Sequence, residues 1–222
     1  MQILEFYSEF INKNDLCFDV GANIGQFTEV FLKLGAKVVC IEPQEECLHR
    51  LYRSFGKNSN VVIVGKAVGE LEGSANLMVC EEANTISTLS DKWVREGRFS
   101  KDYKWTKTQN VSVTTLDALI QLYGLPKFCK IDVEGFEEPV LKGLTKTIPF
   151  ISFEFTQEFY DTAKNCVDRL LFLGYQEFNC SFGHVPQFLF PEWMESEELF
   201  EKMDLMEDKL MWGNIYAKAV SL

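Results

Sequence analysis

Carboxylates stand at the ends of short apolar runs in this chain, and their positions suggest ligand chemistry. Asp19 lies within the apolar run 16–20, and a turn framed by Gly21 and Gly25 follows it directly. Glu42 ends the next apolar run. In an open α/β sheet the carboxyl ends of parallel strands meet at one edge, where such a glycine turn and the helix after it hold a ligand. Both acids are therefore expected beside one nucleotide-like ligand, the alternative being that they are ordinary polar strand ends.

The residues that fill the turn indicate which ligand this is. A dinucleotide fingerprint has glycine at its first, third and sixth positions so that the backbone can approach a pyrophosphate. Here those positions hold Gly21, Asn23 and Gln26. The Asp19 carboxylate would repel a pyrophosphate but would attract the amino group and the sulfonium of S-adenosylmethionine. Glu42 can accept hydrogen bonds from both ribose hydroxyls, which is a feature that NAD sites share. The charge therefore favours S-adenosylmethionine.

Five sequence motifs occur in order along the chain. They are Phe-Asp-Val-Gly-Ala-Asn-Ile-Gly-Gln-Phe-Thr (18–28), Ile-Glu-Pro (41–43), Lys-Ala-Val-Gly (66–69), Thr-Leu-Asp (115–117) and Lys-Ile-Asp-Val-Glu-Gly-Phe-Glu (130–137). Together they resemble the FkbM family of S-adenosylmethionine-dependent methyltransferases, and residues 151–155 resemble that family's next strand. The resemblance implies a class I, Rossmann-like α/β fold with a seven-stranded, mostly parallel sheet and helices on both faces. It also implies, as is common in the family, transfer of a methyl group to a hydroxyl oxygen.

The same resemblance implies a set of cofactor-binding residues. They come from the glycine turn, the end of the second strand, the exit of the third strand and the end of the fourth. The expected set is Asp19, Gly21, Ala22, Asn23, Gly25, Glu42, Pro43, Ala67, Val68 and Asp132. Ala67 and Val68 are expected to pack against the adenine, although the same residues also suit an ordinary strand exit.

A general base is needed because methyl transfer to an alcohol releases the hydroxyl proton, while alignment supplies much of the remaining catalysis. Asp132 is the first candidate because it ends the fourth predicted strand, Glu134 is the second, and Glu154 and His184 follow. Asp132, Glu134 and Glu154 could instead hold a divalent cation, although no metal is predicted. A third interpretation is that Asp132 only hydrogen-bonds the turn or the methionine end of the cofactor.

Composition limits the other possibilities. The 222 residues, 46% of them hydrophobic, can bury one core, so a single domain spanning 1–222 is expected, with an insertion at about 69–115. The net charge of −11 disfavours a nucleic-acid substrate. Seven scattered cysteines without a C-x-x-C pair suit free thiols in a reducing compartment. No apolar run reaches the ~20 residues of a membrane span, so the protein is expected to be soluble and cytoplasmic.

Periodicity and turn residues predict the order of the elements. Helices are expected at 3–11, 26–35, 43–56, 116–124, from 139 onward, at 160–171 and at 195–208, and strands at 16–20, 37–41, 60–64, 74–80, 111–115, 128–133, 148–155, 175–180 and 214–219. The strands 74–80 and 111–115 break the α/β alternation and predict an inserted antiparallel hairpin.

Two aromatic-rich segments, 91–107 and 181–193, are candidates for the mouth of an acceptor site. The segment 91–107 has six basic and three acidic residues, so it carries +3 while the rest of the chain carries −14. It is interpreted either as a solvated loop whose aromatic residues dock on the core, or as a lid that binds a sugar ring or an acidic group.

The functional prediction is an S-adenosylmethionine-dependent methyltransferase that acts on a hydroxyl of a sugar, a glycan or another small metabolite. Two alternatives belong to other classes: a catalytically silent cofactor-binding module that acts through partners, and a nicotinamide-dependent oxidoreductase, which the residues of the turn disfavour. The acceptor is expected to be a small molecule or a carbohydrate, without a nucleic acid or a membrane as partner.

Overall fold

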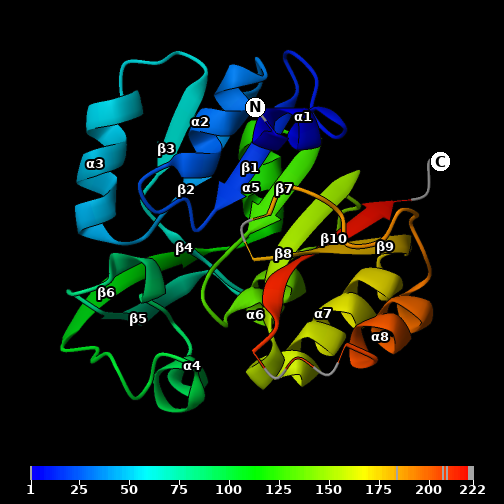
Figure 1. The fold of residues 1–222 in the computed structure, drawn as a ribbon. Helices are drawn as coiled ribbons and strands as arrows, with labels where there is room; N and C mark the ends of the chain where they lie inside the picture. The colour runs from blue at the N-terminus through cyan, green and yellow to red at the C-terminus, as the bar shows by residue number, and fades with distance from the viewer. Residues whose placement is uncertain (1, 184, 207, 209, 220–222) are drawn as a thin grey trace.

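A seven-stranded sheet forms the centre of the computed structural model, which describes residues 2–183, 185–206, 208 and 210–219. Its strands are β1 (Leu16–Val20), β2 (Lys37–Ile41), β3 (Val61–Val64), β7 (Phe128–Ile131), β8 (Phe150–Thr156), β9 (Tyr175–Phe182) and β10 (Trp212–Ala219). They lie in the order β3-β2-β1-β7-β8-β10-β9, and β10 runs antiparallel to both of its neighbours (Figure 1). The predicted seven-stranded, mostly parallel class I methyltransferase fold is confirmed.

The central strands are apolar because helices cover both faces of the sheet. On one face lie α1 (Gln2–Ser8), α2 (Gln26–Lys33) and α3 (Glu45–Phe55), which share a core with β1 and β2. The opposite face is covered by α5 (Leu116–Tyr123), α6 (Glu137–Lys142), α7 (Tyr160–Phe172) and α8 (Ser196–Asp204). Figure 1 shows the first group on the N-terminal half of the sheet and α7 and α8 on the C-terminal half. The two layers leave the carboxyl edge of the parallel strands open.

Aromatic side chains from α1, which ends at Ser8 rather than at residue 11 as predicted, and Phe10 in the turn after it join the beginning of the chain to the sheet. Phe6, Tyr7 and Phe10 are buried and pack edge-to-face or tilted against one another. Tyr7 and Phe10 also contact Phe128 of β7. The N-terminal helix therefore brings Tyr7 to the middle of the molecule.

A second sheet of three strands lies beside the carboxyl edge of the main sheet, between β3 and α5 in sequence (Figure 1). It consists of β4 (Ala67–Val68), β5 (Gly73–Val79) and β6 (Lys107–Thr114). The predicted antiparallel pairing is confirmed because β5 and β6 pair over seven residues of each strand. The structure adds β4, which was expected to be only the exit of the third strand and instead pairs parallel with β6.

Two elements between β5 and β6 were not expected. A helix, α4 (Asp91–Glu96), begins the segment 91–107 that was interpreted as a loop or a lid, and a short 3₁₀ helix, η1 (Asn84–Ile86), precedes it where no element was predicted. Ser90 caps α4 by accepting a hydrogen bond from the Trp93 N–H at 3.1 Å, which is a helix-start signal missed among the surrounding charges. Strand β6 also begins four residues earlier than predicted, because its pairing with β5 rather than its own apolar pattern determines where it starts.

The remaining differences are small. Strand β7 ends at Ile131, so Asp132 lies directly after it, and α8 is confined to Ser196–Asp204. All seven cysteines are buried free thiols. Within the described ranges, no helix has both the length and the apolar character needed to cross a membrane.

Candidate active site

A cavity of about 880 Å³ opens at the carboxyl ends of β1, β2, β7 and β8. One part is lined by the glycine turn, Glu42 and β4, and the other part by residues from β7 through β10. Of the expected cofactor residues, Gly21, Ala22, Asn23, Glu42, Pro43, Ala67, Val68 and Asp132 line it. The volume lies in the range of cavities that bind small molecules and cofactors.

Glycine is required at the start of the turn. Gly21 has φ +78°, and a Cβ at this position would overlap the carbonyl oxygen of Asp132. The close contact between the turn and the residue after β7 therefore depends on a missing side chain. This contact brings Asp132 next to the turn.

The backbone N–H groups of the turn are occupied within the protein. Gly21 and Ala22 both donate to Ile41 O, at 2.9 and 3.1 Å, and Gly25 donates to Ala22 O at 2.8 Å. The Asn23 N–H donates to Glu42 Oε2, also at 2.8 Å. A pyrophosphate would need such donors free. These N–H groups of the turn are therefore not free to bind a pyrophosphate, although the sequence suggested that they converge on the ligand.

Glu42 is held at the cavity wall by two backbone hydrogen bonds. Its Oε1 accepts from the Gln44 N–H and its Oε2 from the Asn23 N–H, both at 2.8 Å. Burial raises the pKa of Glu42 to about 7, against the opposing effect of these two hydrogen bonds. A carboxylate has about four lone-pair sites, so two acceptor sites remain for the two hydroxyls of a ribose.

The adjoining wall is apolar and closes over the same part of the cavity. Ala67 and Val68 are buried and line it, as does Ile86 from η1. The Asn23 side chain donates to Asn84 O at 3.4 Å and so connects the turn to η1. Small apolar side chains opposite a carboxylate fit an adenosine, whose base is flat and whose ribose carries two hydroxyls.

Asp19 is buried in the protein interior, whereas a residue that contacts the ligand directly would be expected at the cavity wall. Neither Asp19 nor Gly25 is among the described residues that line the cavity. The Asp19 side chain is 1% exposed, and its Oδ2 accepts a hydrogen bond from Thr28 Oγ1 at 2.7 Å. Burial raises the pKa of Asp19, against the opposing effects of Lys130 and Thr28. Its binding to the methionine amino group stays a prediction.

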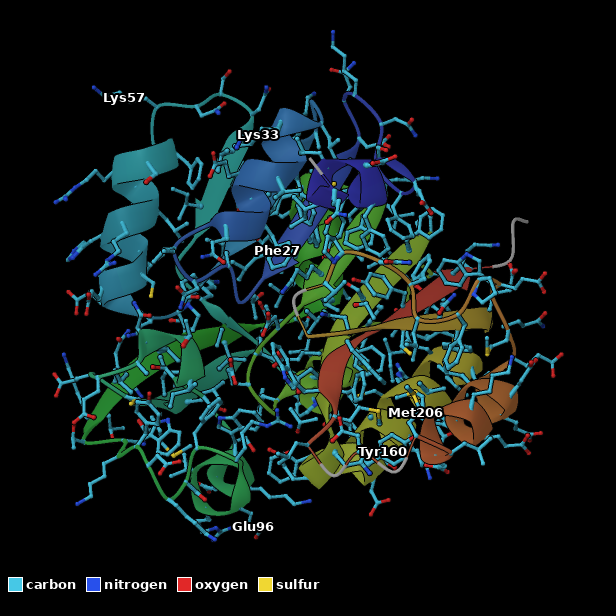
Figure 2. All side chains as sticks on the ribbon, in the orientation of Figure 1. Phe27, Lys33, Lys57, Glu96, Tyr160 and Met206 are labelled. Carbon is cyan, nitrogen blue, oxygen red and sulfur yellow. The ribbon has the colours of Figure 1, made fainter. Side chains whose placement is uncertain are left out.

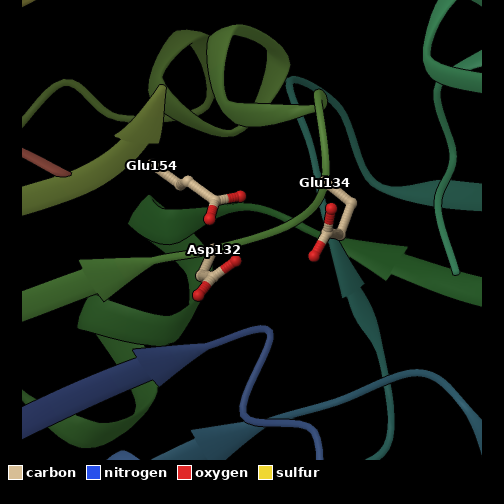
Figure 3. A group of neighbouring side chains, drawn as sticks. All are labelled: Asp132, Glu134 and Glu154. Atoms are coloured by element: carbon tan, nitrogen blue, oxygen red, sulfur yellow. The ribbon is translucent and has the colours of Figure 1, made fainter. Parts of the chain in front are cut away.

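Three carboxylates meet in the second part of the cavity (Figure 3). Asp132 follows β7, Glu134 lies in the loop after it, and Glu154 projects from β8. One oxygen from each lies within 4.8 Å of the others. Burial raises the pKa of Glu134 and of Glu154 well above the ordinary value, and the neighbouring acids, Asp132 first, raise both further. The carboxylate chemistry also suits a hard divalent cation.

The loop that presents Glu134 is strained but well held. Glu134 has φ +55° and Gly135 has φ +83°. The Glu137 carboxylate accepts the N–H groups of Val133 and Gly135, at 3.1 and 3.3 Å, and Thr88 donates to Glu134 O at 2.7 Å. A non-glycine residue in the left-handed region persists only where its surroundings hold it. Here the insertion and the first turn of α6 supply that support.

The insertion also closes one side of the cavity. Trp93 of α4 is 2% exposed and contacts the Phe159 ring at a centroid distance of 5.6 Å. The Arg98 guanidinium donates to both oxygens of Glu158, at 2.8 and 2.7 Å. Burial alone would raise the pKa of Glu158, but Arg98 outweighs it and the pKa is lowered. Trp93, Phe99 and Arg98 line the cavity, so this segment both docks on the core and forms a wall.

The second aromatic-rich segment is divided between the cavity and the core. Gly183, Val185 and Pro186 line the cavity, whereas Phe188 and Trp193 pack with the aromatic group of α1. His184, expected as a distant candidate for the base, lies outside the described residues.

Sequence reasoning assigned no role to several residues that the fold brings to the cavity. Lys130 lies in a predicted apolar strand, and a charged residue two positions before the candidate base was an available signal. Tyr7, Asn214 and Tyr216 come from the two ends of the chain. No local motif identifies these three, because only the packing of α1 and β10 onto β7 and β8 places them there.

Comparison with known protein families shows which family this chain belongs to. The Methyltransferase FkbM domain family matches residues 19–199, which is most of the chain. This chain belongs to the FkbM methyltransferase family. The glycine turn, Glu42, Asp132 and Glu154 of this FkbM domain all lie within the matched residues. The resemblance stated from the motifs is confirmed.

One curated relative is the hexuronic acid methyltransferase AglP of Haloferax volcanii, with 23% identity over 158 residues. The match covers 68% of this chain but only 59% of AglP, so the chain spans somewhat more than half of that relative. Among solved structures, a precorrin-6y C5,15-methyltransferase from Geobacter metallireducens aligns with TM-score 0.52 at 12% identity, covering 98% of this chain and 86% of that one. A precorrin-8W decarboxylase from Methanobacterium thermoautotrophicum aligns with TM-score 0.50 at 13% identity, covering 99% and 90%. At 12% and 13% sequence identity, these two similarities show a shared fold and nothing about function.

Proposed function

We propose that this FkbM domain is an S-adenosylmethionine-dependent methyltransferase that acts on a hydroxyl oxygen of a sugar or another small polyhydroxylated molecule. The observation that carries the proposal is the two-part cavity, in which an adenosine-compatible wall lies next to a group of three carboxylates. Family membership supports methyl transfer. The similarity to AglP, a hexuronic acid methyltransferase, supports a sugar as the class of acceptor.

Residues of the first part of the cavity suit the cofactor. Glu42 has two acceptor sites for the ribose hydroxyls, and Ala67 and Val68 offer an apolar surface to the base. The Asp132 carboxylate at the cavity wall beside the turn favours the amino group and the sulfonium, and Asp19, which is buried against Thr28, stays the predicted partner of the amino group. S-adenosylmethionine would supply a methyl group on a positively charged sulfur, whose carbon–sulfur bond would break as the acceptor oxygen bonds the methyl carbon, with S-adenosylhomocysteine as the leaving group.

Residues of the second part deal with the acceptor proton. The Asp132 side chain is 28% exposed, so the carboxylate can reach both the cavity and the protein interior. It accepts the hydroxyl proton as the oxygen forms its bond to carbon, which is the role of a general base. Glu134 and Glu154, whose pKa values are raised, suit hydrogen bonds to the other hydroxyls of the acceptor. In this proposal all three carboxylates contact the acceptor, and none of them binds a metal ion.

The proposal is tested in two steps. Calorimetry with S-adenosylmethionine, S-adenosylhomocysteine and NAD should show binding of the first two and no binding of NAD. Tritium transfer from methyl-labelled S-adenosylmethionine is then measured on neutral hexoses, hexuronic acids and small phenols, and NMR of the product identifies the methylated atom. Binding of NAD alone would overturn the cofactor assignment. Methyl transfer to nitrogen or carbon, with none to oxygen, would overturn the acceptor class.

A further inference from the structure

A buried lysine lies beside the candidate base. Lys130 is 1% exposed and occupies the middle of β7, where its neighbours in sequence are apolar. Other lysines lie at the periphery, as Lys33 and Lys57 do in Figure 2. An ammonium group is costly to bury, and an apolar side chain of the same length would fill this place without that cost. The contacts of the Lys130 ammonium group must therefore offset the cost of burying it.

The contacts of Lys130 point to Asp132. Its Nζ donates to Asp132 Oδ2 at 2.6 Å, and the two residues lie on the same side of the chain because they are two positions apart. The Phe27 ring lies on another side of the ammonium, with its centroid 4.2 Å from Nζ. Burial alone would lower the pKa of Lys130, but Asp132 and Asp19 outweigh burial and raise it. The lysine is therefore a fixed cation.

Lys130 distinguishes Asp132 from the other two acids of the cavity. Among the described residues, the Glu134 and Glu154 side chains form no hydrogen bond or ion pair, whereas the Asp132 carboxylate is held through one oxygen. That bond leaves Oδ1 for the acceptor. Since a displacement of about 1 Å can reduce a rate by about 10²-fold, the orientation of this carboxylate matters for catalysis.

We propose that Lys130 is a positioning residue for methyl transfer, whose ammonium group holds Asp132 in the orientation that receives the acceptor proton. The proposal rests on the proposed role of Asp132 as general base. Lys130 acts through Asp132, and it contributes to turnover rather than to cofactor binding.

The experiment compares Lys130→Met, Lys130→Arg, Asp132→Asn and the double variant Lys130→Met/Asp132→Asn. Lys142→Met is the matched control, because it breaks another lysine–carboxylate pair, with Glu138 at 2.9 Å on α6, away from the cavity. Turnover and KM are measured with the sugar that the tritium assay identifies, and affinity is measured by calorimetry with S-adenosylhomocysteine. Crystals of each variant with S-adenosylhomocysteine report the Asp132 orientation without an acceptor.

Lys130→Met should lower kcat by about 10- to 100-fold, with the acceptor KM and the S-adenosylhomocysteine Kd changed by less than about threefold. Lys130→Arg should recover much of the lost turnover, and Lys142→Met should have none of these effects. The double variant should be no slower than Asp132→Asn, because residues that act as a unit are not additive. In the Lys130→Met crystal, the Asp132 carboxylate should leave its wild-type orientation.

The inference is overturned if the two single effects multiply in the double variant, or if Asp132 keeps its orientation without Lys130. It is also overturned if Lys130→Met fails to fold while the double variant folds, because Lys130 then serves stability. Failure of the proposed base is distinguishable, since Asp132→Asn would then turn over at the wild-type rate while S-adenosylhomocysteine still binds.

Discussion

Glu42 supports the fold with the same carboxylate that we propose as the ribose ligand. Its carboxylate holds the N–H groups of Asn23 and Gln44 and still faces the cavity. Burial raises its pKa to about 7. Ribose hydroxyls donate to the ionised form, so ligand binding lowers this pKa and releases a proton. Affinity should therefore rise as the pH increases through about 7.

We expect the Kd for S-adenosylhomocysteine to fall by up to about tenfold between pH 6 and pH 8, because the ionised fraction of Glu42 rises from roughly a tenth to roughly nine tenths. Glu42→Gln should weaken binding at pH 8 by about 1–3 kcal/mol and flatten the pH dependence. Calorimetry at both pH values checks this, with the exposed Glu45→Gln as the control. Unchanged affinity in Glu42→Gln would remove Glu42 from the site.

Asp132 is the residue on which the proposed chemistry depends. Asp132→Asn keeps the shape of the side chain but cannot take up the proton, so turnover should fall by about 10²- to 10⁴-fold while S-adenosylhomocysteine affinity changes much less. Initial rates with the accepted sugar measure this effect. If Mg²⁺ or a chelator alters the wild-type rate by a comparable factor, the carboxylate is better assigned as a metal ligand. Wild-type turnover in the variant would move the search to Glu134.

At the scale of elements, the insertion between β4 and α5 forms one wall of the cavity. Arg98 joins this insertion to the main domain through Glu158 and also lines the cavity. We expect Arg98→Gln to raise the acceptor KM several-fold and to leave S-adenosylhomocysteine affinity unchanged, because the wall near the acceptor loosens while the cofactor wall stays intact. Steady-state kinetics and calorimetry measure the two quantities.

The matched control for Arg98→Gln is Lys101→Gln, in the same segment but exposed to solvent. It removes the same charge and should change neither quantity. An equal loss of cofactor affinity and acceptor affinity in Arg98→Gln would show that the segment is a scaffold for the whole cavity.

Helix α4 should also contribute to stability through Trp93. This side chain is buried against Phe159 and beside Gly135, at the boundary between the insertion and the main sheet. Trp93→Ala should reduce the free energy of unfolding by about 3–5 kcal/mol, the usual cost of truncating a buried Trp. Urea unfolding followed by circular dichroism measures this value, with the half-buried Tyr103→Ala as control. Two separate transitions would contradict the prediction that residues 1–222 form a single domain.

At the scale of the whole molecule, the negative net charge disfavours nucleic acids as partners. The net charge of −11 repels polyanions, and the basic segment 91–107 has one of its cations, Arg98, bound to Glu158. We expect no binding of a 20-nucleotide single-stranded RNA at micromolar protein concentration and 150 mM salt, as measured by fluorescence anisotropy. Submicromolar affinity that falls steeply with salt would contradict this and would reopen nucleic acid as an acceptor.

Local patterns were sufficient for most of the fold and for placing the glycine turn and Glu42 at the edge where the cavity lies. The run 16–20 predicts β1 with its observed bounds, and the same is true of 37–41 and β2, because strands buried on both faces are continuous apolar runs. The turn and Glu42 could be placed from their positions at strand ends. Polar strands such as β6 and the short helix α4 were missed, because pairing and packing with the rest of the molecule define them.

The sequence by itself determined the class I architecture, the family and the edge of the sheet where the cavity lies, since these follow from periodicity and from motifs contiguous in the chain. Only the tertiary structure decided which acids share one space. It turned Asp19 inward to Thr28, brought Glu154 from β8 to Asp132, and placed Lys130 against that same carboxylate. Side-chain direction and burial depend on neighbours that are distant in sequence, so the charge environment of the site could be known only after the sheet was assembled.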